Sequence, residues 1–405
     1  MLALLIVAII TGALLKMPIE VLIKSITTGI GSTLGSLVMV LALGAMIGKL
    51  AEESGAALKL VSVLIGWFGR KNAQWAILIT SLLVGIPLFY NAGFVVLVPL
   101  VFAIGSATGL PVLFLALPMA AALSVTHGFL PPHPGPIALV TIFHADVGRV
   151  LLYGLGLAIP TSIIAGIFLP KFILKGGDNL HLDSNITITE KVMPSALKSF
   201  VIALMPIVFI TIGTVGGALS PNVGKPLFTF FSDPTFALLL SLIITLAIID
   251  IPLQVAMNHA VDGVKSVAMI ILIIASGGAF KQILVDSGIG ESIKEYSAIL
   301  NLSPLFLAWL ITAMLRVTLG SATVAALTAS GMVLPLIQTG TSPELMVLAV
   351  GAGSLMLSHV NDTGFWMFKE YFNLSIKETF KTWTVMESAV SILGLLGVLF
   401  LDKII

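Results

Sequence analysis

A cluster of prolines inside an apolar tract constrains this chain more than any other feature. The stretch Thr126–Pro136, THGFLPPHPGP, holds four prolines. Proline lacks a backbone donor and disfavours helix in the residue before it, so no regular helix can run through this stretch. Lipid cannot satisfy the freed backbone groups, which must therefore face protein or a water-filled cavity. Broken helices of this kind commonly form the binding sites of transporters.

The composition places the stretch in a membrane. The chain has 405 residues, of which 58% are hydrophobic and 10% are charged, whereas soluble domains carry about 25% charged residues. We therefore expect an all-α, multi-pass protein of the cell membrane that contacts the lipid bilayer. A net charge of +1 argues against nucleic acid as a partner. The absence of cysteine excludes disulfides, thiolate metal sites and cysteine nucleophiles.

Two long apolar tracts differ from the simple spans. Each contains a polar or glycine-rich interruption, followed by a link that ends in proline. We predict that each forms a re-entrant helical hairpin and then a transmembrane helix that breaks midway. The hairpins are predicted at about 73–107 and 304–340, and the broken helices at about 111–144 and 344–372. Simple spans are predicted at 2–15, 30–48, 150–169, 199–218, 235–250, 266–285 and 383–401.

The chain also resembles itself. At nearly one offset, Glu53-Ser54-Gly55 falls on Asp286-Ser287-Gly288, Pro111 on Pro343, and Thr126-His127 on Ser358-His359. Such agreement predicts two repeats, 1–170 and 199–405, joined by the polar linker 171–198.

Charge then predicts the orientation of the two repeats. Most Lys and Arg residues fall in 49–71, 171–198, 251–265 and 369–381, which we assign to the cytoplasm. The two hairpins then open to opposite sides, so the repeats are predicted to be inverted, as in many secondary transporters. The span 199–218 has no counterpart in the first repeat, which suggests a further helix upstream of Met1.

Both hairpin tips contain small and polar residues. The first includes Asn91, and the second is Gly320-Ser321-Ala322-Thr323. Helix ends at such a tip can point free backbone amides at a ligand. The alternative is a tight turn between packed helices, for which small residues are also suited. Because the tips recur in corresponding places, we expect Asn91, Ser321 and Thr323 to contact substrate.

Arg316 lies one turn before the second tip, inside an apolar run. A charge there costs about 3 kcal/mol unless it is paired or hydrated. A guanidinium suits a carboxylate ligand, which it can hold with two hydrogen bonds. The alternatives are an arginine that reaches the membrane interface and a structural ion pair with Asp362.

The stretch Ser358–Trp366, SHVNDTGFW, corresponds to the proline cluster but has no proline. Asn361 could bind substrate, and Asp362 could bind a cation, carry a proton or cap the following half-helix. Thr126, His127 and His359 are further candidates, because imidazole can bond hydroxyls or relay protons. A structural role is the alternative for both histidines.

No motif for catalysis, metal binding or phosphate binding is found. We therefore expect no enzyme activity, no metal and no cofactor.

These motifs resemble those of the gluconate permease (GntP) family, proton-coupled sugar-acid symporters of the ion transporter superfamily. The similar strings run through nearly the whole chain and include PLFYNAGFVVLVPL, THGFLPPHPGP, RVTLGSATVAALTASG and SHVNDTGFWMFKEYF. The resemblance implies a symporter that imports gluconate or a related small carboxylate by an elevator-like motion. Members commonly have glutamate where this chain has Asn91, which cannot exchange a proton. The coupling proton is then expected at Asp362 or His127.

Several alternatives stay open. One is a sodium-coupled or exchange transporter for another organic anion or D-serine. In the sodium-coupled case, sodium would take the place of the proton as the coupling ion. A membrane-embedded enzyme that uses His127 and Asp362 is disfavoured by the lack of a nucleophile motif, and a channel by the lack of a polar pore-lining stripe. A homo-oligomer is also left open. The substrate-binding candidates are Arg316, Asn91, Thr126, His127, Ser321, Thr323, His359 and Asn361.

Overall fold

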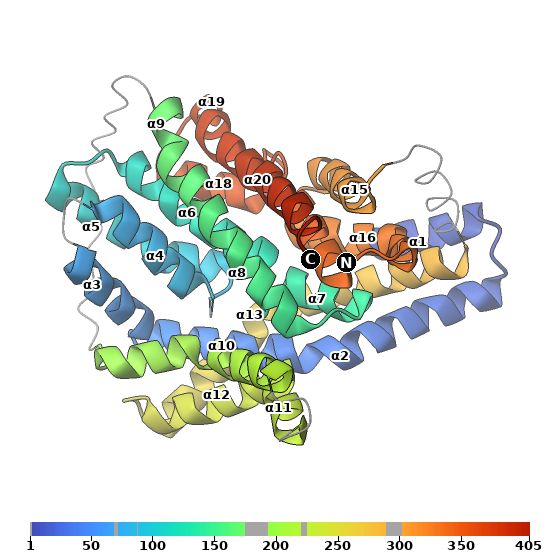
Figure 1. The fold of residues 1–405 in the computed structure, drawn as a ribbon, viewed down its shortest axis with the longest axis horizontal. Coiled ribbons are helices and arrows are strands. Elements are labelled where there is room, and N and C mark those ends of the chain that lie inside the picture. The colour runs from blue at the N-terminus through green and yellow to red at the C-terminus, as the bar shows by residue number, and fades with distance from the viewer. Residues whose placement is uncertain (1, 69–71, 87, 175–192, 220–224, 289–301) are drawn as a thin grey trace.

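The protein is built of helices (Figure 1). The structure, a computed structural model, describes residues 2–68, 72–86, 88–174, 193–219, 225–288 and 302–405, and no strand occurs among them. Five helices are long and apolar enough to cross a membrane, or up to seven if two bent helix pairs each count as one span. The predicted all-α, multi-pass membrane class is confirmed.

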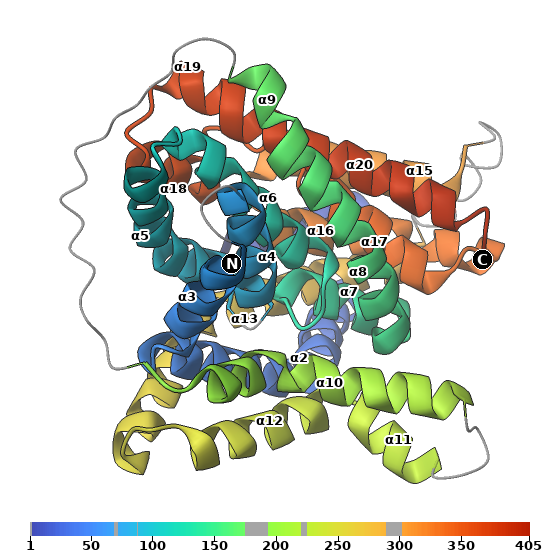
Figure 2. The same ribbon diagram turned by 60° about the vertical axis from the view of Figure 1, so that its left-hand side comes forward.

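One group of helices forms a layer along one side of the molecule, which we call the base layer. Its helices α10 and α12 run along the lower edge of the molecule in Figures 1 and 2. Its long helices are α2 and α13, which pack along one another. The helices of this group are α1 (Leu2–Leu14), α2 (Ile19–Glu53), α3 (Ala56–Phe68), α10 (Ala196–Leu219), α11 (Lys225–Ser232), α12 (Pro234–Ile248) and α13 (Leu253–Asp286).

We call the remaining helices the hairpin group. They include two helical hairpins, α4/α5 and α15/α16, and two broken helices, α6/α7 and α17/α18. Their bounds are α4 (Ala73–Gly85), α5 (Tyr90–Thr108), α6 (Val112–Phe129), α7 (Pro134–Phe143), α8 (Val147–Ile163), η2 (Ile164–Phe168), α9 (Pro170–Ile173), α15 (Pro304–Leu319), α16 (Ala322–Val333), η3 (Leu334–Thr339), α17 (Pro343–Gly353), α18 (Thr363–Tyr371), α19 (Ile376–Thr379), η4 (Phe380–Thr384) and α20 (Val385–Leu401).

Glycines let α2 and α13 approach closely. A Cβ atom on Gly29 would overlap the carbonyl oxygen of Gly278, and one on Gly278 would overlap that of Gly29. Farther along, a Cβ on Gly263 would lie 2.5 Å from the carbonyl oxygen of Ala45. Small residues at such crossings let helix backbones come together and gain packing contacts in a membrane protein. The base layer is therefore joined by backbone contact along much of α2 and α13.

The sequence analysis made both of these helices too short. The predicted span 30–48 lies inside α2, which begins at Ile19, and the span 266–285 lies inside α13. Residues 251–265 were expected to be a loop, but α13 already begins at Leu253. The segment was assigned to a cytoplasmic loop because it lies between two predicted spans, whereas α13 packs along α2 and the segment is helical.

Both predicted breaks occur where expected. The chain leaves the helix after Phe129 at the proline cluster and resumes at Pro134, which occupies the first helical turn. The second break runs between Gly353 and Thr363, and Asp362 caps the helix that follows. The hairpin and the broken helix thus follow one another in the same order in both halves. The inversion of the halves, re-entry from one side of the bilayer and the boundaries 1–170 and 199–405 stay predictions.

The broken helices form the centre of the hydrophobic core. Nearly every residue of α6 and of α17 is buried, whereas most residues of α10 are only half-buried or exposed. An apolar helix with exposed side chains suits contact with lipid, while a helix buried on all sides suits the interior of the bundle. The two breaks therefore lie inside the protein, where other groups can satisfy their backbone. Most of the predicted linker 171–198 lies outside the described residues.

The close crossing of α2 and α13 yields a stability prediction. Gly263→Ala places a methyl group against the Ala45 carbonyl, so the helices must separate. We expect a loss of about 1–3 kcal/mol, seen as a lower midpoint of thermal unfolding in detergent. Gly31→Ala on α2 is the control, because nothing lies within 4 Å of its Cβ position. An equal midpoint for both variants would contradict this account of the packing.

Candidate functional site

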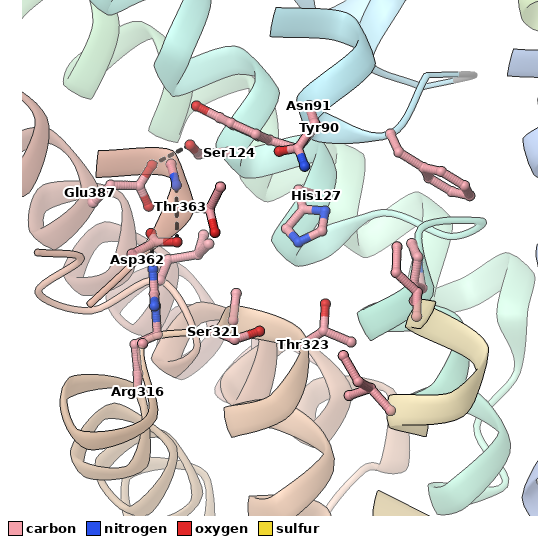
Figure 3. Close-up of a pocket in the computed structure, with 18 of the residues that line it drawn as sticks. Tyr90, Asn91, Ser124, His127, Arg316, Ser321, Thr323, Asp362, Thr363 and Glu387 are labelled. Atoms are coloured by element: carbon pink, nitrogen blue, oxygen red, sulfur yellow. Dashed lines mark hydrogen bonds and ion pairs between the residues drawn. The ribbon is translucent and has the colours of Figure 1, made fainter. Parts of the chain in front are cut away.

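A cavity of about 430 Å³ opens between the two hairpin tips and the two breaks. Its volume falls in the range of small-molecule sites, about 300–1,000 Å³. Polar side chains from both halves of the chain point into it (Figure 3). The lining residues are Phe89, Tyr90, Asn91, Ser124, His127, Pro134, Ser266, Ile270, Ile273, Arg316, Gly320, Ser321, Ala322, Thr323, Leu355, Asp362, Thr363, Gly364, Trp383 and Glu387.

The second hairpin tip forms one wall. The helix α15 ends at Gly320, whose φ of +75° is the left-handed conformation that favours glycine. A Cβ there would overlap the carbonyl oxygen of Asn361, so the tip lies directly against the second break. Ser321 caps α16, and its hydroxyl accepts a hydrogen bond from the Val324 amide at 3.4 Å. Thr323 follows in the first turn and lines the cavity.

An ion pair joins this hairpin to the break. Arg316, only 2% exposed, donates from its NH2 group to Oδ2 of Asp362. The same oxygen accepts from the Ser358 hydroxyl, and Oδ1 accepts from the Gly364 amide at 3.1 Å. The Nε and NH1 groups of Arg316 are buried without a hydrogen-bond partner. The structural pairing considered for Arg316 is therefore present, and it leaves two donors free.

The second break is also held by the start of α20. Trp383 and Thr384 belong to η4, a π-helical turn that directly precedes this helix. The indole Nε1 of Trp383 donates to the Ser358 hydroxyl at 2.7 Å, and the Thr384 hydroxyl donates to the Ser358 carbonyl at 2.6 Å. These bonds satisfy polar groups of an irregular segment inside the membrane protein, as burial requires. Short π-helical turns frequently occur at functional sites.

Two histidines, His127 and His133, lie on either side of the first break. His133 is buried, and its Nε2 lies 2.6 Å from the carbonyl oxygen of Gly85 at the end of α4. The carbonyl can only accept, so Nε2 carries the proton and satisfies the end of that helix. The sequence analysis had not singled out His133 for this contact. His127 lines the cavity, and its Nδ1 has no partner. Pro87 at this tip lies outside the described residues.

Glu387 is a functional candidate that the sequence analysis missed. It lies on α20, is 2% exposed and lines the cavity, and it accepts a hydrogen bond from the Ser124 hydroxyl of α6. In Figure 3 it lies on the same side of the cavity as Asp362 and Arg316, across from His127 and Asn91. The sequence could have identified Glu387, because an ionisable residue inside a predicted membrane span, here 383–401, by itself indicates a functional role. Tyr90, Ser124 and Trp383 were missed as well.

The cavity contains six of the predicted site residues: Asn91, His127, Arg316, Ser321, Thr323 and Asp362. Thr126, His359 and Asn361 do not line it. The Thr126 hydroxyl donates to the Leu123 carbonyl at 2.8 Å, and the Asn361 amide donates to the Val317 carbonyl at 2.9 Å. His359 is half-buried, and its Nδ1 has no partner. Within the described part of the chain, no group of three or more His, Asp or Glu residues could hold a metal ion.

Comparison with known proteins decides the family. Residues 1–405 match the family described as GntP family permease. The chain belongs to the GntP family of permeases. This multi-pass permease is therefore a membrane transporter rather than an enzyme, as expected, and the resemblance of its motifs is confirmed.

Its relatives cover its full length. It is 47% identical over 413 residues to the high-affinity gluconate transporter of Escherichia coli (strain K12), covering 100% of this chain and 94% of the relative. It is 46% identical over 417 residues to the Gnt-II system L-idonate transporter of the same organism, with the same coverage. The gluconate permease of Bacillus subtilis (strain 168) is 42% identical over 422 residues, again covering 100% of this chain and 94% of that protein.

Two solved structures share the fold. The YdaH transporter of Alcanivorax borkumensis superposes with a TM-score of 0.66 at 16% identity, covering 93% of the permease and 87% of that chain. MtrF of Neisseria gonorrhoeae gives a TM-score of 0.63 at 20% identity, covering 95% and 84%. At these identities the likeness establishes the architecture alone.

The ion pair of the permease yields a second prediction. Asp362→Asn leaves the Arg316 guanidinium buried without a counter-charge, but asparagine still caps a helix well. We expect a loss of roughly 3 kcal/mol, the usual cost of breaking a buried pair, seen as a lower thermal midpoint in detergent. Glu370→Gln is the control, because Glu370 is 68% exposed and pairs with its neighbour Lys369 at the surface. If both variants unfold at the wild-type midpoint, the pair contributes nothing to stability.

Proposed function

We propose that this permease is a secondary active transporter that imports gluconate, or a closely related small hydroxy carboxylate, with protons as the driving ion. Relatives named for gluconate and L-idonate transport support this substrate class. The observation that carries the proposal is the buried Arg316, with two free donors beside a cavity of polar side chains. A buried guanidinium with free donors suits a carboxylate ligand.

The carboxylate is held by Arg316. Its NH2 group already bonds Asp362, while Nε and NH1 are buried and unpaired. Unmade hydrogen bonds of a buried charged group are costly, so a ligand that completes them gains free energy. Asp362 keeps the guanidinium in place and offsets part of its charge. This arrangement favours an anion with a single negative charge.

The hydroxyl groups of the substrate meet the polar side chains around the rest of the cavity. Asn91 and His127 approach from the first tip and the first broken helix, and Ser321 and Thr323 from the second tip (Figure 3). Each of these groups can donate or accept a hydrogen bond. A site built for hydroxyls rejects analogues that lack them, because its buried polar groups are then left unpaired. A plain fatty acid of equal length is therefore a poor ligand.

Transport requires the cavity to open on each side in turn. Three lining residues, Ser266, Ile270 and Ile273, belong to α13 of the base layer, and the others belong to the hairpin group. The cavity thus lies where the two groups of helices meet. Movement of the hairpin group along α13 would carry the ligand and its binding residues together, in the elevator-like manner that the family resemblance implied.

Substitution of the arginine tests the substrate assignment. Arg316→Lys keeps the positive charge but removes the planar pair of donors. Losing one hydrogen bond to a charged group costs about 1.5–3 kcal/mol, so we expect the apparent affinity for gluconate to fall about 10- to 150-fold. The measurement is radiolabelled gluconate counterflow in proteoliposomes. Arg149→Lys is the control, because Arg149 is exposed at the start of α8.

Two further arms sharpen this test. Gluconamide, which is neutral, is expected not to compete with gluconate, and equal competition would refute recognition of the carboxylate. Accumulation driven by a pH gradient supports proton coupling. Accumulation that follows a sodium gradient and resists a protonophore would instead identify sodium as the driving ion.

A further inference from the structure

We propose that Glu387 is the site at which the coupling proton binds and is released during transport. The inference rests on the proposed function and deepens it. It is carried by a buried carboxyl group that shares the substrate cavity but has no cation of its own. The sequence analysis had pointed instead to Asp362 or His127 for this role.

The surroundings of the two carboxyl groups differ sharply. Asp362 bonds the Arg316 guanidinium, the Ser358 hydroxyl and the Gly364 amide, so each neighbour favours the ionised form. It also caps α18, where the helix dipole favours a negative charge. Asp362 is thus a fixed anion that balances Arg316. Taking up a proton there would break contacts that hold the second break.

Glu387 has only one hydrogen-bond partner among the described residues. The Ser124 hydroxyl donates to Oε1, which leaves Oε2 without a bond. No lysine or arginine in the described part of the chain pairs with it. An ionised carboxylate buried without a cation is costly, and binding a proton removes that cost. A hydroxyl can also donate or accept, so Ser124 can bond either form.

The groups that face Glu387 come from several elements. Arg316 of α15 and Asp362 before α18 are the charged groups whose fields act on it. Tyr90 of α5 and His127 of α6 are the other ionisable groups that line the cavity. The helices α8 and α17 and the turn η2 also pack against α20, but they bring no ionisable side chain to the cavity lining. One cation and one fixed anion therefore already balance around Glu387.

The substrate and the proton then favour each other's binding. A substrate carboxylate beside an ionised Glu387 would bring three carboxylates to the single guanidinium of Arg316, whereas a protonated Glu387 leaves two. The coupling is reciprocal, because each ligand changes the affinity for the other by the same factor. On the outer side a proton from water forms the O–H bond at Oε2. On the inner side this bond breaks, the proton returns to water, and the anion leaves.

Side-chain hydrogen bonds connect the helix that carries Glu387 to the ion pair of Arg316 and Asp362. It lies one turn after Thr384, which bonds the Ser358 carbonyl, and the Ser358 hydroxyl in turn bonds Asp362. On the other side, Trp309 of α15 donates to the Ser391 hydroxyl of α20 at 3.0 Å. The helices that carry Glu387, Asp362 and Arg316 are thus joined by side-chain hydrogen bonds.

The decisive variant is Glu387→Gln, which resembles the protonated form and cannot release a proton. We expect it to catalyse gluconate counterflow near the wild-type rate, because exchange needs no net proton movement. It should fail to accumulate gluconate when a pH gradient is imposed with the membrane potential held at zero. With one proton per gluconate anion, we expect the wild-type protein to accumulate gluconate up to about tenfold per pH unit under these conditions. A pH-sensitive dye inside the vesicles should report acidification with gluconate influx for the wild-type protein only.

The outcomes separate the two proposals. Accumulation by Glu387→Gln that equals the wild-type level overturns the role of Glu387 and leaves the proposed function standing. If the wild-type protein shows no gluconate counterflow, the proposed function itself is overturned. Glu370→Gln, an exposed glutamate, is expected to accumulate normally. If Glu387→Gln does not fold, Ser124→Ala decides: its pH profile of uptake must shift from that of the wild-type protein, and an identical profile refutes the proposal.

Discussion

The ion pair between Arg316 and Asp362 is the interaction on which the arrangement of the cavity depends. A guanidinium inside a membrane protein must be paired or hydrated. Here the counter-charge of Arg316 is Asp362, the last residue of the second break. Asp362 can serve because it also caps α18 and accepts from Ser358. One carboxylate thereby fixes the end of α15, the start of α18 and, through Ser358, the start of α20. The Nε and NH1 groups of Arg316, a residue that lines the cavity, are left without a hydrogen-bond partner.

The two breaks satisfy their backbone by different means. At the first, prolines remove donors outright, and His133 satisfies the carbonyl of Gly85 at the adjoining tip. At the second, side chains supply the partners: Asp362 bonds the Gly364 amide and Thr384 the Ser358 carbonyl. A break built on proline is conformationally restricted whatever binds beside it. A break held by a charged side chain such as Asp362 feels a change of charge in the cavity. A substrate anion that binds there would therefore act on the second break.

The sequence anticipated those features that have a local physical cause. A cluster of prolines, or glycine beside polar residues, ends a helix, although single prolines such as Pro118 and Pro160 lie inside α6 and α8. The two breaks and the two hairpins could therefore be placed from such clusters in the sequence. The lengths of α2 and α13 could not, because their ends are held by packing against each other rather than by an end signal. Among the site residues, Arg316 and Asp362 were found as charges in apolar tracts. Thr126 and Asn361 were expected to reach substrate, but their hydrogen bonds go to backbone carbonyls.

Glu387 shows why position along the chain is a weak guide to the cavity. It lies in an apolar span without a break, and the corresponding span of the first half, 150–169, holds no charged residue. Neither the repeat nor the prolines therefore point to it. Only the fold brings α20 against α6 and places its carboxyl beside Ser124. A glutamate at the Asn91 position would put an acid at the exposed tip, whereas Glu387 puts one in the buried wall. An acid in the wall is shielded from water until the cavity opens, and timed access of this kind is what coupling a proton to a substrate requires.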